Sequence, residues 1–130
     1  MGTPGTSTTM RIGTVAERTG LSLRTLRHWD EVGLVTPSGR TDGGFRLYTD
    51  TDVDRILLVR RMKPLGFSLD EMAGLLDVVH RLAGGETIDP DGADLRARLD
   101  EFTTTARARR ADLARKLDMA DELIALLGAV

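Results

Sequence analysis

The stretch from residue 14 to residue 48 constrains the fold of this 130-residue chain more than any other part of it. Apolar residues at helical spacing run up to Gly20, and glycine commonly ends a helix because it adopts the left-handed backbone conformation. Ser22 is a suitable N-cap for a second helix, and Gly33 is a suitable end for it. The sequence therefore predicts two short helices joined by a tight turn.

The second of these helices is predicted to have one apolar face and one basic face. Leu23, Leu26 and Val32 are expected to face the core, and Trp29 is expected to be partly buried. The solvent face then carries Arg24, Thr25, Arg27 and His28. Arginine can donate two hydrogen bonds to guanine, and threonine and histidine can reach base edges or phosphates. Two helices joined by a short glycine-containing turn form a helix-turn-helix, which sets its second helix in the major groove, so the pattern predicts DNA binding.

A small β-hairpin is expected after the second helix. Residues 34–48 are rich in turn formers, and Phe45–Tyr48 alternates apolar and polar side chains like a short strand. We interpret this region as a wing that adds Arg40 and Arg46 to the basic surface. Tyr48 is equally compatible with a core position and with a hydroxyl that reaches a phosphate.

Helix ends supply the remaining predicted contacts with DNA. Ser22 lies at the start of the second helix, and Arg18 lies at the end of the first. A third helix that ends near Pro64 carries Arg60 and Lys63. The predicted DNA-binding residues are therefore Arg18, Ser22, Arg24, Thr25, Arg27, His28, Arg40, Arg46, Tyr48, Arg60 and Lys63.

The chain as a whole is predicted to be mainly α-helical. The third helix is expected to start at Asp50 or Thr51, and the capping box Ser68–Glu71 introduces a fourth. The predicted divisions are a disordered tail over 1–9, a winged helix-turn-helix domain of four helices and a wing over 10–83, a linker over 84–93, and a last helix over 94–127.

The last predicted helix has no partner of equal length within the chain. No glycine or proline interrupts residues 94–127, and apolar residues recur there mostly at steps of three and four, with Arg109 at the one skipped position. We therefore expect it to pair with the same helix of a second copy, as a coiled coil. The predicted dimerisation residues are Leu95, Leu99, Phe102, Ala106, Leu113, Leu117, Ala120, Ile124 and Leu127.

Charge and composition narrow the class of function. The net charge is −2, but residues 1–66 carry +3 and residues 67–130 carry −5, so a basic half is available for phosphate. The chain has no cysteine, no calcium-loop spacing, no phosphate loop and no catalytic motif, so we expect no metal, no cofactor and no enzyme activity. It also lacks a long apolar run and a secretory signal, so we expect a cytoplasmic, nucleoid-associated protein with no membrane contact.

Several linked segments resemble the MerR family of bacterial transcription regulators. They are Thr25–Val35 followed by Gly44–Tyr48, with the similarity starting at Arg11–Ala16 and continuing through Leu65–Glu71. The resemblance covers about residues 11–82, and the last helix matches the family's dimerisation helix in placement. It differs in having His28-Trp29 where members often carry two tyrosines, and Pro64 where a continuous helix is common.

This resemblance implies a homodimer held by an antiparallel coiled coil of the last helices. It implies binding to a pseudo-palindromic promoter whose spacer is too long, with the DNA bent and untwisted so that RNA polymerase can engage. Arg24, Thr25, Arg27 and His28 would then lie at the groove. Two alternatives stay open from the residues alone: an architectural or accessory DNA-binding protein with weak sequence preference, and a protein–protein adaptor that acts through its coiled coil.

Overall fold

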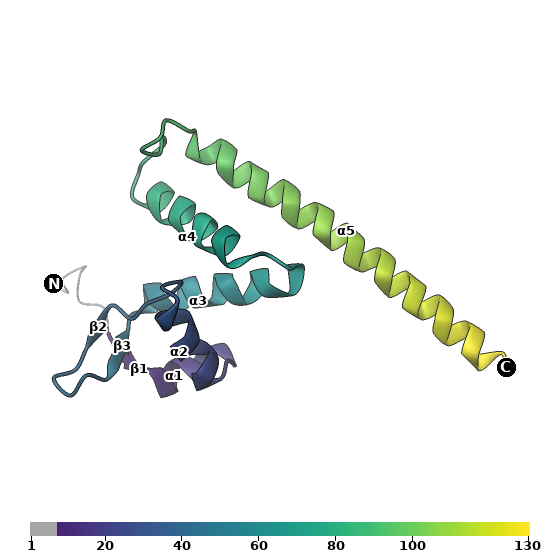
Figure 1. Ribbon diagram of the computed structural model, residues 1–130, viewed down its shortest axis with the longest axis horizontal. Coiled ribbons are helices and arrows are strands. Elements are labelled where there is room, and N and C mark those ends of the chain that lie inside the picture. The colour runs from purple at the N-terminus through teal and green to yellow at the C-terminus, as the bar shows by residue number, and fades with distance from the viewer. Residues whose placement is uncertain (1–7) are drawn as a thin grey trace. The chain divides into compact units, whose positions relative to one another are not determined.

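The computed structural model describes residues 8–130, and Figure 1 shows the order of its elements. Residues 1–7 of the predicted tail lie outside the described residues. The elements are β1 (Met10–Arg11), α1 (Ile12–Thr19), α2 (Leu23–Glu31), β2 (Gly39–Arg40), β3 (Arg46–Tyr48), α3 (Asp50–Met62), the 3-10 turn η1 (Lys63–Leu65), α4 (Leu69–Ala83) and α5 (Leu95–Gly128). The prediction of a mainly helical fold with four helices, a small wing and a long last helix is confirmed.

The chain divides into two compact units. The first comprises residues 8–64 and 68–73, and the second comprises residues 65–67 and 74–130. The first unit contains the helix-turn-helix and the wing, whereas the second contains α5. The division into a 10–83 domain, an 84–93 linker and a 94–127 helix stays a prediction.

The wing is part of a three-stranded antiparallel sheet with the order β1-β3-β2. The predicted hairpin is formed by β2 and β3, in which Arg40 pairs with Arg46. The sequence analysis missed β1, whose Met10 pairs with Tyr48 and whose Arg11 pairs with Leu47. A two-residue strand has no alternation to detect, because only pairing with a distant strand defines it.

The core of the first unit shows which face of α2 is buried. Leu26 and Trp29 are buried, as expected, but Leu23 and Val32 are exposed, so their predicted core positions were wrong. Each step of three residues turns about 60° around a helix, which carries residues at both ends of such a row away from the buried face. Leu34 and Val35, which follow the turn at Gly33, are buried instead.

Asp52 connects the start of α3 to the loop before β2. Its carboxylate accepts hydrogen bonds from the backbone N–H of Thr49 at 3.0 Å and from the N–H of Ser38 at 3.0 Å, and the Ser38 hydroxyl donates to it at 2.5 Å. The Asp52 N–H donates in return to the Thr49 hydroxyl, which completes a capping box. A single buried carboxylate therefore fixes both the helix start and the path of the chain into the wing.

Replacement of Asp52 by alanine is expected to lower the free energy of unfolding by about 2–3 kcal/mol, because it removes the carboxylate half of the capping box and leaves donors of Thr49 and Ser38 unsatisfied. Chemical denaturation monitored by circular dichroism measures the change. Asp54→Ala, at an exposed position of the same helix, is the control and should cost less than about 0.5 kcal/mol. Equal losses in the two variants would contradict this role for Asp52.

In the second unit, a short hydrogen-bonded loop leads into the start of α5. The carboxylate of Asp89 accepts hydrogen bonds from the backbone N–H groups of Asp91 and Ala93, both at 3.1 Å, and pairs with Arg98 at 2.5 Å. Asp94 caps the helix by accepting from the N–H of Arg96 at 3.0 Å. The 34 residues of α5 then run about 50 Å without a break. Among residues 8–130, no helix is long and apolar enough to cross a membrane.

Candidate nucleic-acid interface

The turn between α1 and α2 sets the direction of α2. Gly20 ends α1 with a φ of 69°, a conformation that favours glycine. The Ser22 hydroxyl oxygen then accepts a hydrogen bond from the Thr25 N–H at 3.1 Å and caps α2. Ser22 also donates to the Thr25 hydroxyl at 2.9 Å. The structure thus gives both predicted contact residues a defined place in the first turn of α2.

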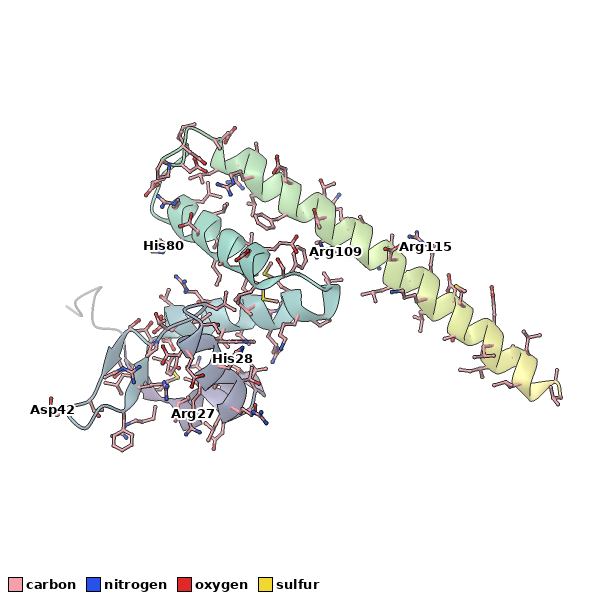
Figure 2. The ribbon with its side chains drawn as sticks, in the orientation of Figure 1. Arg27, His28, Asp42, His80, Arg109 and Arg115 are labelled. Carbon is pink, nitrogen blue, oxygen red and sulfur yellow. The ribbon has the colours of Figure 1, made fainter. Side chains whose placement is uncertain are left out.

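The basic side chains of α2 lie on its solvent side, as the sequence predicts. Arg24, Arg27 and His28 are exposed, whereas Leu26 and Trp29 are buried. Figure 2 labels Arg27 and His28 on this helix. Within residues 8–130, neither Arg24 nor Arg27 forms an ion pair, so both guanidinium groups keep their donors available.

An open groove runs along this face of α2 and reaches the end of α3. The Lys63 ammonium group lies 5.8 Å from the centre of the Trp29 ring, a distance at which a cation is attracted to an aromatic face. Trp29 is therefore a core residue that also holds a cation at the edge of the groove. The groove is lined by Arg24, Thr25, Arg27, His28, Trp29, Glu31 and Lys63.

The wing is tied to α2 through Asp30. One carboxylate oxygen of Asp30 accepts from Arg46 Nε at 2.7 Å and from Arg40 Nη2 at 3.1 Å. The hydrogen bond with Asp30 raises the pKa of Arg46 further above its ordinary value. Arg40 also donates to the Gly44 carbonyl across the hairpin at 3.2 Å. The two predicted wing arginines are thus brought together by a residue of the helix.

Other predicted contact residues have partners within the fold. Arg18 pairs with Asp50 at 2.9 Å, and Arg60 donates to the Thr19 carbonyl. Tyr48 is fully buried in the core. The predicted cationic residues therefore form two groups. Some are held by a partner within the protein, and others, such as Arg27, form no ion pair among residues 8–130.

A comparison with protein families decides which class of protein this is. The family described as "MerR HTH family regulatory protein" matches residues 10–78. This match covers more than half of the chain and contains the helix-turn-helix, the wing and α3. The chain belongs to the MerR family. It is accordingly a member of a family of DNA-binding transcription regulators.

Named relatives agree with this assignment. The regulator YfmP of Bacillus subtilis is 35% identical over 119 residues, which cover 88% of this chain and 80% of YfmP. The activator TipA of Streptomyces coelicolor is 47% identical over 66 residues, 51% of this chain and 26% of TipA. The chain spans about a quarter of the length of the first curated relatives that it matches. These relatives are regulators, which supports a non-enzymatic role.

A solved structure of a MerR-family regulator provides the matching fold. HiNmlR, described as a family regulator that lacks the sensor domain and is bound to promoter DNA, is 29% identical to this chain. The match covers 91% of this chain and 89% of HiNmlR, with a TM-score of 0.65. The similarity therefore extends beyond the helix-turn-helix into the C-terminal half.

Among the predicted DNA-contact residues of this MerR-family chain, Tyr48 is fully buried, which bears directly on whether it can contact DNA. Its hydroxyl is buried without a hydrogen-bond partner among the described residues, and burial raises the pKa of Tyr48. A buried hydroxyl without a partner costs free energy rather than adding to stability. The ring, and not the hydroxyl, is what the fold uses.

Replacement of Tyr48 by phenylalanine is therefore expected to leave the free energy of unfolding unchanged or to raise it by up to about 1 kcal/mol. DNA affinity should also stay unchanged, which fluorescence anisotropy with a bound duplex can measure. Tyr48→Ala is the comparison and should cost about 3–5 kcal/mol, because the ring fills the core. A large loss of affinity in Tyr48→Phe with an intact fold would show that the hydroxyl contacts DNA.

Sequence reasoning missed two residues of this surface. The first is Asp30, for which an acidic residue on a basic helix next to two basic strands is a signal for an ion pair. Arg11 was also missed, and its guanidinium lies 4.7 Å from the centre of the exposed Phe45 ring on the wing. Both contacts connect segments distant in sequence, so periodicity could not show them.

The predicted dimerisation residues differ in exposure along α5. Leu95 is fully buried, and Leu99, Phe102 and Ala106 are half-buried within the protomer. Leu113, Leu117, Ala120, Ile124 and Leu127 are exposed. Leu95 is therefore a core residue of the protomer, whereas the members of the predicted set from Leu113 onward are all exposed.

Arg109 explains the skipped apolar position in α5. Its guanidinium stacks 4.4 Å from the centre of the Phe67 ring and donates to the Leu65 carbonyl at 3.3 Å. It thereby holds α5 against the chain segment 65–67 of the same unit. Arg109 and Arg115 are labelled along α5 in Figure 2.

Proposed function

We propose that this MerR-family chain is a homodimeric, sequence-specific transcription regulator that binds a pseudo-palindromic promoter. The observation that carries the proposal is the solvent face of α2, where Arg24 and Arg27 extend from a capped, core-anchored helix into an open groove. Arginine pairs with guanine through two hydrogen bonds, which is the commonest specific contact in the major groove. The promoter-bound form of HiNmlR, which has the same fold, supports this interpretation.

We assign two kinds of contact to the predicted surface. Base edges are contacted by Arg24, Thr25, Arg27 and His28, all of which line the groove. The phosphate backbone is contacted by Arg18, Ser22, Arg40, Arg46, Arg60 and Lys63. Phosphate contacts fix the register of the protein on the duplex, and base contacts supply the specificity. Tyr48 is left out of both groups because its hydroxyl is buried.

Dimerisation through α5 is the second part of the proposal. Leu113, Leu117, Ile124 and Leu127 form an exposed apolar row along α5, and a contiguous exposed apolar patch commonly marks a protein–protein contact. An antiparallel pairing of two α5 helices would cover this face in both copies and give a two-fold symmetric dimer, which matches a two-fold symmetric DNA site.

The third part concerns what the dimer does to its promoter. We propose that it bends and untwists an overlong spacer so that RNA polymerase can engage, without a direct contact with the polymerase. Such a distortion reads the deformability of base steps that the protein does not touch. A series of promoters that differ only in spacer length would test this distortion. Activation by the protein should be lost when the spacer has its ordinary length.

Binding to DNA is tested by footprinting the untagged protein across its genome and then measuring affinity for the recovered duplex. A regulator gives few sharp sites upstream of genes, an inverted repeat within them, and affinity that falls steeply with salt. Broad coverage without a shared motif would favour the architectural alternative. A monomer without DNA affinity would favour the adaptor alternative and contradict the proposal.

A further inference from the structure

Asp30 connects the recognition helix α2 to the wing. It lies in the last turn of α2, and its side chain is 11% exposed. The same oxygen of its carboxylate accepts from both wing arginines, at 2.7 Å from Arg46 and 3.1 Å from Arg40. No other carboxylate pairs with these two arginines among the described residues.

The two arginines are held with different firmness. Arg46 is 22% exposed and uses its Nε in the shorter contact, so its direction is set by Asp30. Arg40 is 49% exposed and is held from a second side by the Gly44 carbonyl at 3.2 Å. Both guanidinium groups keep further N–H donors for a ligand, because a guanidinium carries five. Asp30 thus orients two guanidinium groups and leaves some of their N–H donors available.

We propose that Asp30 is a positioning residue that sets the specificity of DNA binding. The proposal rests on the proposed function. Arg40 and Arg46 reach phosphates in the one arrangement that α2 permits, because the carboxylate that holds them belongs to α2. The negative charge of Asp30 also offsets part of the attraction of the wing for any phosphate, an attraction that carries no sequence information. Asp30 therefore strengthens the specific complex relative to the non-specific one.

This role predicts opposite effects on the two kinds of complex when the charge is removed. In Asp30→Asn the wing arginines lose their charged partner, and the amide oxygen that remains is a weaker acceptor, so the specific complex loses oriented contacts. At the same time the surface becomes more positive, so the affinity for an unrelated duplex stays the same or rises. The ratio of specific to non-specific affinity should fall about tenfold or more. A residue needed only for folding would lower both affinities together.

The experiment compares variants of the whole 130-residue chain on the selected operator and on a scrambled duplex of equal length, by fluorescence anisotropy over a series of salt concentrations. Asp42→Asn is the matched control, because it removes the same charge from the loop of the same wing (Figure 2). Its specificity ratio should stay within about twofold of the parent. Thermal unfolding of each variant is followed in parallel.

A double-variant cycle separates positioning from stability. If Asp30 acts through Arg46, then Arg46→Gln lowers the specificity ratio in the parent but has little further effect in Asp30→Asn. If Asp30→Asn does not fold, Arg40→Gln tests instead whether an arginine that Asp30 orients contributes to specificity, since it removes the more exposed arginine and keeps the Asp30–Arg46 contact. Its ratio should then fall by about threefold or more.

A folded Asp30→Asn with an unchanged ratio, or equal loss of both affinities, would overturn the proposal, as would an unchanged ratio in Arg40→Gln where that variant is used. A parent protein that prefers no duplex over its scrambled version would contradict the proposed function instead. The two failures are distinguished by the parent protein alone.

Discussion

Joint replacement of Leu117 and Ile124 by aspartate is expected to leave the protein monomeric and to lower its affinity for an inverted-repeat operator by at least about 100-fold. Both side chains are more than 60% exposed in the isolated chain, so the protomer loses no core contact. In a dimer each copy would bring two carboxylates into the apolar seam, where a charge without a partner is costly. Two linked binding units gain about 100-fold or more over one unit, and that gain is lost with the dimer.

The control adds the same charges to the other side of α5. Ala111 and Ala125 are exposed and lie more than about 100° around the helix from the centre of the predicted seam, as the 3.6-residue period of the helix requires. Ala111→Asp combined with Ala125→Asp should keep both the dimer and the operator affinity. Sedimentation gives the mass of each variant, and circular dichroism gives its helix content. A seam variant that stays dimeric, or a control that dissociates, would place the interface elsewhere.

The helices were predictable from the sequence because their signals are local. The capping box at Ser68 is present as expected, with the Glu71 N–H donating to the Ser68 hydroxyl at 3.1 Å and the Ser68 N–H donating to the Glu71 carboxylate at 2.9 Å. The uninterrupted run at the C-terminus forms the single long helix α5. In both helices the N-cap, the apolar periodicity and the absence of glycine and proline lie within a few residues of one another. The local sequence is therefore enough to predict the helix.

The errors concern features that depend on contacts between distant segments. The strand β1 exists only because β3 pairs with it. Asp52 is buried because Ser38, fourteen positions earlier, donates to it. Leu23 was expected in the core but is exposed, whereas Leu34 and Val35, which follow the turn at Gly33, are buried. Periodicity describes one helix at a time, so it cannot show which neighbour covers a given face.

The candidate site shows the same limit in its electrostatics. The sequence identified a basic surface, but it could not distinguish cations with an internal partner from cations without one. Arg46 and Arg18 are engaged by Asp30 and Asp50, whereas Arg24 and Arg27 form no ion pair within residues 8–130. This division changes the expected consequences of mutation, because an anchored arginine contributes to the fold as well as to binding.

Replacement of Arg27 by alanine is expected to lower operator affinity by about 30-fold or more. The guanidinium lies on the solvent face of α2 in the groove, and its loss should leave the core unchanged. A bidentate contact with a base contributes about 1–3 kcal/mol to discrimination, and a dimer would lose it in both half-sites. Arg96→Ala, at an exposed position of α5, removes the same charge and should change affinity by less than about threefold.

Arg27→Lys separates charge from geometry at the same position. Lysine keeps the positive charge but lacks the planar fork that donates two parallel hydrogen bonds. Its affinity for a scrambled duplex should therefore match the parent, while its affinity for the operator should fall nearly as far as that of Arg27→Ala. Equal operator affinity for Arg27→Lys and the parent would mean that Arg27 contacts a phosphate, and the base contact would then have to come from another residue of the groove.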